Sequence, residues 1–128
     1  MRLLLDTHIA LWAVADDRRL SAKARSLIVD PANEIVVSTA SLWEIAIKRA
    51  LAPNDMPISA SEALGYFREA GYELLDISPA HVIAVEALAA LHADPFDRIL
   101  VAQALNVPLR LLTHDPKVAS YSDSIIAV

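Results

Sequence analysis

The chain has 128 residues, 55% of them apolar, which is enough for one hydrophobic core and too apolar for a disordered protein. It has no cysteine, which excludes disulfide frameworks, thiolate zinc sites and cysteine nucleophiles and fits a reducing cytoplasm. The net charge of −5 argues mildly against nonspecific binding of nucleic acid, although carboxylates devoted to a metal would explain part of that charge. We expect one domain over residues 1–128.

The first half of the chain alternates between short β-branched or leucine-rich runs and helical patterns. Prolines and polar residues at 53–57 suit a loop that ends this half. The predicted elements are strands at 2–5 and 34–37, and helices at 7–15, from Ser21 onward and at 40–51.

The second half continues the alternation. Ser59 and Glu62 form a capping-box pattern that opens a helix, and Gly71 can close it. Ser78 and Pro79 start another helix. The further predicted elements are strands at 73–77, 109–112 and 124–128, and helices at 80–91 and 95–106.

Short apolar strands that alternate with helices predict an α/β fold. We expect a three-layer α/β/α sandwich whose central sheet is mainly parallel and has four or five strands. The run at 3–5 is too short for a signal-peptide core, and no segment approaches the roughly 20 apolar residues that span a bilayer. The sequence therefore predicts a cytoplasmic protein without a membrane partner.

Certain carboxylates fall at informative places. Asp6 ends the first predicted strand and Asp115 follows the strand at 109–112, so both lie at carboxyl ends, where parallel sheets bind ligands. Glu44 lies one turn into a predicted helix, and Asp97 lies in the first turn of another. Each position also has a structural explanation. Asp6 and Asp115 can cap helices, Asp97 can complement a helix dipole, and Glu44 can pair with Lys48.

The joint pattern favours a metal site over these separate roles. Close carboxylates repel one another unless a cation binds between them. Hard oxygen ligands select Mg²⁺ or Mn²⁺, and such ions cleave phosphodiesters in many enzymes. With only two glycines, the chain has no glycine-rich phosphate loop, so nucleotide cofactors are not expected.

Four segments resemble PIN-domain proteins of the VapC type in order and spacing across nearly the whole chain. They are residues 3–8 (LLLDTH), 41–48 (SLWEIAIK), 94–98 (DPFDR) and 112–115 (LTHD).

The resemblance implies a PIN-like fold and a metal-dependent endoribonuclease, the toxin of a toxin–antitoxin pair. Asp6, Glu44, Asp97 and Asp115 match the acids that surround Mg²⁺ or Mn²⁺ in that family. The implied partners are an RNA substrate, a small antitoxin protein whose segment covers the acidic site, and a second copy of the chain in a homodimer.

Other residues near these motifs are secondary candidates. Asp94 is a metal neighbour or the cap before Pro95, and Thr7 and Thr113 can hold a carboxylate or cap a helix. Phosphate contacts are expected from Lys48 and Arg98. The histidines have no metal-ligand spacing with one another and are left out of the predicted site: His8, His81, His92 and His114.

Two alternatives stay open at this stage. A receiver-like signalling module also binds Mg²⁺ at a sheet edge, but it resembles an acidic pair after the first strand, whereas Asp6 is followed by Thr7. A non-catalytic PIN-like scaffold would need no acidic quartet.

Overall fold

A computed structural model describes residues 1–128. The strands are β1 (Arg2–Leu5), β2 (Glu34–Ser38), β3 (Glu73–Leu75), β4 (Arg110–Thr113) and β5 (Ile126–Ala127). The helices are α1 (Thr7–Ala15), α2 (Ala22–Val29), α3 (Thr39–Leu51), α4 (Ala60–Glu69), α5 (Pro79–Glu86), α6 (Pro95–Asn106) and α7 (Pro116–Ala119).

The five strands form one parallel sheet in the order β3-β2-β1-β4-β5. The central strand β1 pairs with β2 on one side, where Leu3 lies opposite Ile35, and with β4 on the other, where Leu4 lies opposite Leu111. Because the strands are parallel, their carboxyl ends share one edge. After β1 the chain forms β2 and β3 on one side of that strand, and it later forms β4 and β5 on the other side. Ligands of parallel sheets bind at the carboxyl ends of the strands where the strand order reverses in this way, here beside β1.

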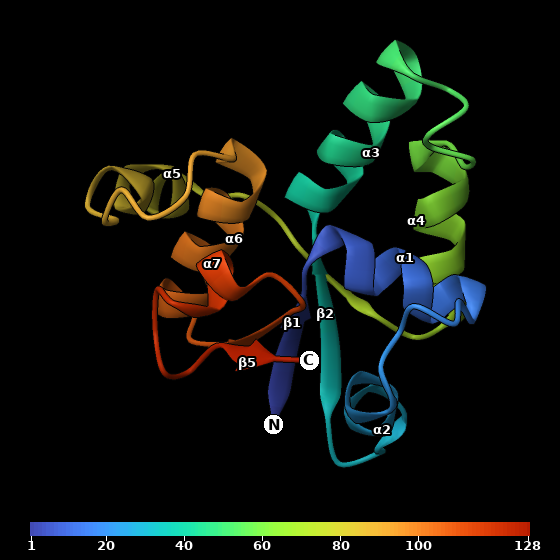
Figure 1. The fold of residues 1–128 in the computed structure, drawn as a ribbon, viewed down its shortest axis with the longest axis horizontal. Helices are drawn as coiled ribbons and strands as arrows, with labels where there is room; N and C mark the ends of the chain where they lie inside the picture. Colours follow the sequence, from blue (N-terminus) through green and yellow to red (C-terminus); the bar gives the residue numbers. More distant parts are fainter.

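Helices cover both faces of the sheet, which confirms the three-layer sandwich (Figure 1). Side chains alternate along β1: Leu3 and Leu5 enter a core with residues of α1, α2, α3 and α4, whereas Leu4 enters a second core with α6 and α7. Leu3, Leu4 and Leu5 are fully buried, as expected for a strand covered on both faces.

Helix α5 is shorter than predicted. It ends at Glu86 rather than continuing to residue 91, and the chain runs through turns and irregular backbone to Asp94. The N–H groups of Ala87 and Leu88 bond three residues back, to Ala84 and Val85, which tightens and closes the helix. The alanine-rich sequence of residues 87–91 favours a helix, but tertiary contacts of residues 87–94 hold the backbone in another conformation.

Two predicted strands are also too long. β3 stops at Leu75 instead of residue 77, because the sheet pairing ends where Ser38 lies opposite Leu75 and Ile77 N–H turns to the Thr39 hydroxyl. β5 contains only Ile126 and Ala127 rather than 124–128.

Small shifts occur elsewhere. Ser38 extends β2 and caps α3, and β4 is displaced by one residue, to Arg110–Thr113. The short helix α7 follows Asp115, as its capping position suggested. No helix has the length and apolar character needed to cross a membrane.

Candidate metal centre

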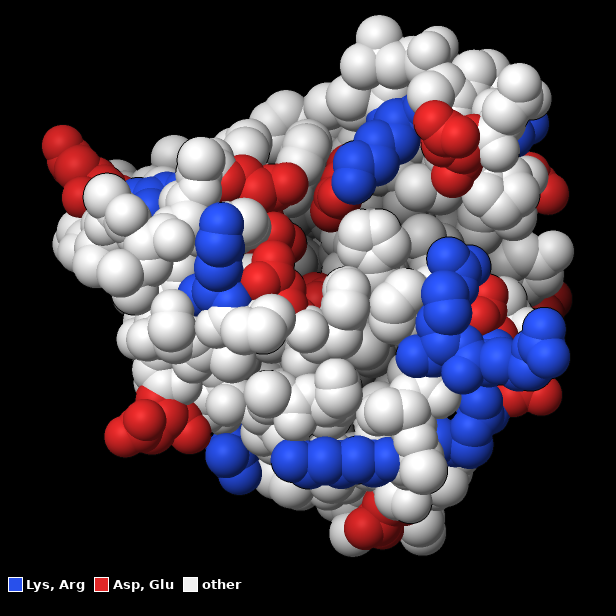
Figure 2. Space-filling view, viewed as in Figure 1, with Lys and Arg blue, Asp and Glu red and all other residues white.

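Acidic side chains gather in a hollow between the α6–α7 side of the molecule and the α1–α3 side, at the carboxyl edge of the sheet (Figure 2). Lys and Arg side chains lie on both sides of this hollow (Figure 2). The predicted quartet contributes to it from four places in the fold. Asp6 follows β1, Glu44 lies on α3, Asp97 lies on α6, and Asp115 follows β4.

Asp6 is almost completely buried and caps α1, with its Oδ1 accepting the N–H of Ile9 at 2.8 Å. Burial raises the pKa of its carboxyl, and hydrogen bonds from Ile9 and from the Thr113 hydroxyl oppose that rise. Nearby imidazoles also oppose it, the closest being His114, whose Nδ1 lies 3.9 Å from Asp6 Oδ2. The cap therefore fixes one oxygen, and the other lies near the His114 ring.

Glu44 is equally buried but has a partner on each oxygen. The Thr7 hydroxyl donates to Oε1 at 2.6 Å, and Lys48 Nζ pairs with Oε2 at 2.5 Å. Thr7 Oγ1 also lies 3.0 Å from the buried Ser41 hydroxyl. The predicted i,i+4 pair is confirmed, and Thr7, as expected, holds a carboxylate.

Asp97 lies in the first turn of α6 with about a quarter of its side chain exposed. Its pKa is raised to about 6, against a usual value of 3.8, chiefly because the carboxyl is partly buried. The hydrogen bond with His92 lowers the pKa, and repulsion from Asp94, Asp6 and Glu44 contributes to the rise. The repulsion indicates that these carboxylates lie close enough to disfavour one another's charge.

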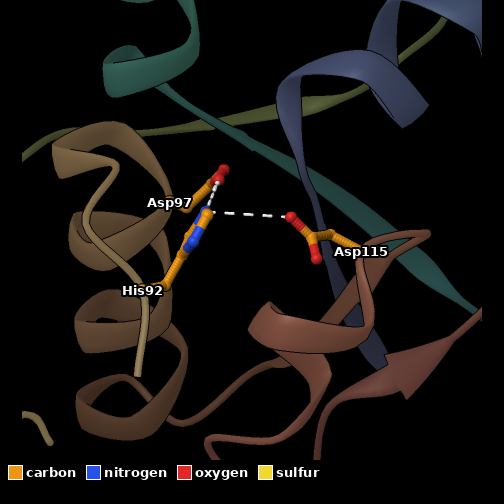
Figure 3. A group of neighbouring side chains, drawn as sticks. All are labelled: His92, Asp97 and Asp115. Atoms are coloured by element: carbon orange, nitrogen blue, oxygen red, sulfur yellow. Dashed lines mark hydrogen bonds and ion pairs between the residues drawn. The ribbon is translucent and has the colours of Figure 1, made fainter. Parts of the chain in front are cut away.

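Asp115 completes the group from the other side of His92 (Figure 3). Its Oδ1 caps α7 by accepting Lys117 N–H, and its own N–H donates to the Thr113 hydroxyl. Its Oδ2 lies 3.7 Å from His92 Nε2, which is itself 2.8 Å from Asp97 Oδ2. Ligand atoms of His92, Asp97 and Asp115 all lie within 4.8 Å of one another.

Two secondary candidates have clear structural roles. Asp94 Oδ1 accepts the N–H groups of Phe96 and Asp97 and so caps α6. The guanidinium of Arg98 donates to the Tyr121 hydroxyl and to backbone carbonyls of the preceding loop. This geometry favours a structural role for Arg98 over the expected phosphate contact. Lys48, with 43% of its side chain exposed, lies at the rim of the hollow.

His92 and Ser41 were missed from the sequence. His92 was set aside because no other histidine stands at ligand spacing, yet the partners that matter are carboxylates supplied by α6 and by the end of β4. Its position two residues before the DPFDR segment was the only local signal. Ser41 begins the SLWEIAIK segment, but a serine in a helical pattern gave no sign of its contact with Thr7.

The donor set fits a divalent cation. Buried or half-buried carboxylates converge with few positive neighbours, and the pKa values of both Asp6 and Asp97 are raised in consequence of burial. A cation placed among them would compensate charge that the protein alone compensates poorly. Oxygen-rich ligands without thiolates suit Mg²⁺ or Mn²⁺ rather than a structural zinc.

Comparison with known proteins identifies the family of the chain. A model of the PIN domain family matches residues 3–123. The chain is 30% identical over 122 residues to Ribonuclease VapC22 of Mycobacterium tuberculosis. The aligned region covers 93% of this chain and 91% of that protein. The chain belongs to the PIN domain family.

Solved structures share the fold. A VapBC2 complex from Rickettsia felis, bound to a DNA fragment from its promoter, superposes with a TM-score of 0.70 at 18% identity, covering 100% of this chain and 98% of that one. DNA-bound VapBC from Salmonella typhimurium gives 0.68 at 15% identity, covering 100% and 97%. Within the family, the receiver-like alternative has no further support.

Proposed function

We propose that this protein is a divalent-metal-dependent endoribonuclease of the VapC type, the toxin of a toxin–antitoxin pair that acts in the cytoplasm. The observation that carries the proposal is the convergence of Asp6, Glu44, Asp97 and Asp115 at one edge of the sheet, in a PIN domain. The ribonuclease activity named for VapC22 supports the same reaction here.

Each acid would have a distinct part. Asp97 and Asp115 would hold the Mg²⁺ or Mn²⁺ ion from the α6–α7 side, and Asp6 would hold it from the end of β1. Glu44, with both oxygens occupied by Thr7 and Lys48, would contribute mainly negative potential until Lys48 moves. When bound, the ion supplies Lewis acidity to the phosphodiester and lowers the pKa of water.

The chain's own groups then orient the reactants. Asp115, whose side chain is the most exposed of the four at 32%, would accept a hydrogen bond from the attacking water. Lys48 at the rim would contact an RNA phosphate once its contact with Glu44 is exchanged. The net charge of −5 disfavours RNA binding only if charge is spread evenly, and Lys and Arg side chains lie on both sides of the hollow (Figure 2). Binding of RNA depends on this local potential.

The direct test is cleavage of RNA by the parent protein with Mg²⁺ or Mn²⁺, with and without EDTA, compared with Asp6→Asn. The substitution keeps an oxygen that accepts Ile9 N–H, so the α1 cap survives. Asp30→Asn is a matched control, because Asp30 Oδ1 also accepts a backbone N–H, from Ala32, outside the cluster. We expect metal-dependent cleavage by parent and control only. Equal cleavage by folded Asp6→Asn contradicts the assignment.

We infer two protein partners, a small antitoxin and a second copy of the chain. The structural neighbours are VapBC complexes, including a toxin–antitoxin complex from Klebsiella pneumoniae (TM-score 0.62, 20% identity, covering 98% of this chain and 96% of that one). A small antitoxin with a basic side chain could neutralise the acids in competition with the metal. Exposed Trp43 and Leu51 on α3 and Val82 and Ile83 on α5 support a homodimer. Light scattering of the chain alone and with the product of the adjacent reading frame tests both partners.

A further inference from the structure

One histidine side chain lies between two acids of the cluster. His92, from the segment between α5 and α6, directs its Nε2 between the carboxylates of Asp97 and Asp115, at 2.8 Å and 3.7 Å (Figure 3). Its side chain is only 18% exposed, less than either of the two acids. The imidazole is therefore part of the wall of the site and lies close to both of these acids.

The backbone on either side of this histidine is held from α6 and from the segment after α7. His92 N–H donates to the Tyr121 hydroxyl at 3.0 Å, and His92 C=O accepts from Arg98 Nη1 at 3.3 Å. Arg98 Nη1 also donates to Tyr121 Oη and to Ala89 C=O, both at 3.0 Å. These contacts fix the loop that carries the ring, so the position of Nε2 is set by structure outside the local sequence.

The distances suit a shared cation. Ligand atoms that surround an ion at about 2.1 Å are about 3 to 4.2 Å apart, as the geometry of an octahedron requires. The ligand atoms of His92, Asp97 and Asp115 lie within 4.8 Å of one another, so small side-chain rotations would bring all three onto one ion. A histidine that served only to orient Asp97 would have no need to face Asp115 as well.

We propose that His92 Nε2 is a nitrogen ligand of the divalent ion held by Asp97 and Asp115, so that this centre prefers Mn²⁺ to Mg²⁺. The inference rests on the metal site proposed above and adds to it a ligand of a different chemical type. His92 binds as neutral imidazole with its hydrogen on Nδ1. Mg²⁺ favours oxygen ligands and retained waters, whereas imidazole favours transition metals, so one nitrogen shifts selectivity between the two ions.

The test is made on the full-length protein loaded with Mn²⁺, without RNA. Pulsed electron paramagnetic resonance detects the hyperfine coupling of a directly bound imidazole nitrogen. We expect this coupling in the parent, its change when histidine is labelled with ¹⁵N, and its loss in His92→Gln. Glutamine can still hydrogen-bond to Asp97, and the labelled parent shows whether any histidine nitrogen binds the ion even if the variant fails to fold.

A matched control distinguishes His92 from the histidine on the other side of the cluster. His114 Nδ1 lies 3.9 Å from Asp6 Oδ2, and we expect His114→Gln to keep the nitrogen coupling. Calorimetric titrations give a second readout. The ratio of Mn²⁺ to Mg²⁺ affinity should fall about 10-fold in His92→Gln, the low end of the range for changes in groups around a metal.

The outcomes separate this inference from the nuclease assignment. RNA cleavage by a parent protein whose bound Mn²⁺ has no nitrogen coupling overturns the inference and leaves the function intact. Nitrogen coupling in a protein that cleaves no RNA supports the inference and contradicts the function. Coupling that persists in His92→Gln, coupling that disappears in His114→Gln, or no Mn²⁺ binding at all overturns the inference.

Discussion

The two sides of the acidic hollow differ in burial and in what holds them. On the α1–α3 side, Asp6 and Glu44 expose 7% and 4% of their side chains, and on the α6–α7 side Asp97 and Asp115 expose 25% and 32%. The buried side is fixed by helix caps and short hydrogen bonds within the core. The exposed side depends on the segment at residues 87–94, which long-range contacts hold in place.

The acids on the two sides also differ in how their charge is compensated. Glu44 already has a hydroxyl and an ammonium as partners, so its charge is stabilised before any metal binds. Asp97 has no such cation beyond the neighbouring imidazole, and its pKa is raised by burial and by repulsion from Asp94, Asp6 and Glu44. Glu44 is therefore compensated within the protein, whereas Asp97 and the buried Asp6, whose pKa is also raised, would gain most from a bound ion.

The largest effect is expected from Asp97→Asn, which removes the charge that faces the other acids. Activity should fall at least about 100-fold, beyond the usual cost of losing a supporting group around a metal. Asp94→Asn, three residues earlier, is the matched control because asparagine caps helices as well as aspartate does. Initial rates of RNA cleavage at saturating Mn²⁺ should change less than about threefold in this control. A comparable loss in both variants would make Asp94 part of the site.

A smaller loss is expected from Thr7→Val, which keeps the shape and removes the donor to Glu44 Oε1. Activity should fall about 10- to 100-fold, and unfolding should become easier by about 1–3 kcal/mol, because a buried carboxylate oxygen loses its partner. Thr39→Val removes a hydroxyl at the start of α3 that accepts Ile77 N–H. That control should lose stability but little activity, as measured by urea unfolding and cleavage rates. Full activity in Thr7→Val would show that Glu44 needs no fixed orientation.

The stability of the metal-free protein should depend on pH through Asp97. Its pKa is raised from 3.8 to about 6, so the folded state holds this proton more tightly than the unfolded state. The contribution to stability is therefore present below about pH 4 and is lost as pH rises to about 6, by about 1–2 kcal/mol after allowance for partial solvation. Asp97→Asn should remove that part of the pH dependence in urea unfolding with EDTA. An unchanged profile in the variant would assign the dependence to other groups.

The smallest effect is expected from Tyr121→Phe, which removes the hydroxyl that joins His92 N–H to Arg98. Metal affinity should fall about 3- to 10-fold, and amide hydrogen exchange over residues 87–94 should accelerate, while α1 and α3 stay protected. Tyr66→Phe removes a hydroxyl from an exposed side chain on α4 and serves as control. Faster exchange on both sides of the hollow would contradict their independence.

Much of this site could be predicted because it depends on local sequence and topology. Asp6 and Asp115 follow strands, and parallel strands in neighbouring positions bring their ends together. Glu44 and Asp97 lie on helices, where the acids alone had equally good structural explanations, and the resemblance to PIN-domain proteins selected the metal role for them.

The rest depends on contacts between distant residues. Helix α5 was predicted to extend to residue 91 because alanine, valine and leucine favour a helix. Instead, the Arg98 guanidinium donates to the carbonyls of Val85 and Leu88, and the Tyr121 hydroxyl accepts the N–H of His92. The Arg98–Tyr121 contact joins residues 23 apart, which no local pattern reveals. His92 owes its place near Asp97 and Asp115 to these contacts, and the sequence alone therefore could not assign it to the site.

The most direct test of the metal centre is anomalous X-ray diffraction from crystals of the protein grown with Mn²⁺. We predict an anomalous peak in the hollow, within bonding distance of oxygens of Asp97 and Asp115 and nearer to Asp6 than to Glu44. Asp97→Asn crystals grown in the same way should lose it. Ordered Mn²⁺ elsewhere on the protein, with the acidic hollow empty in parent crystals, would contradict the account.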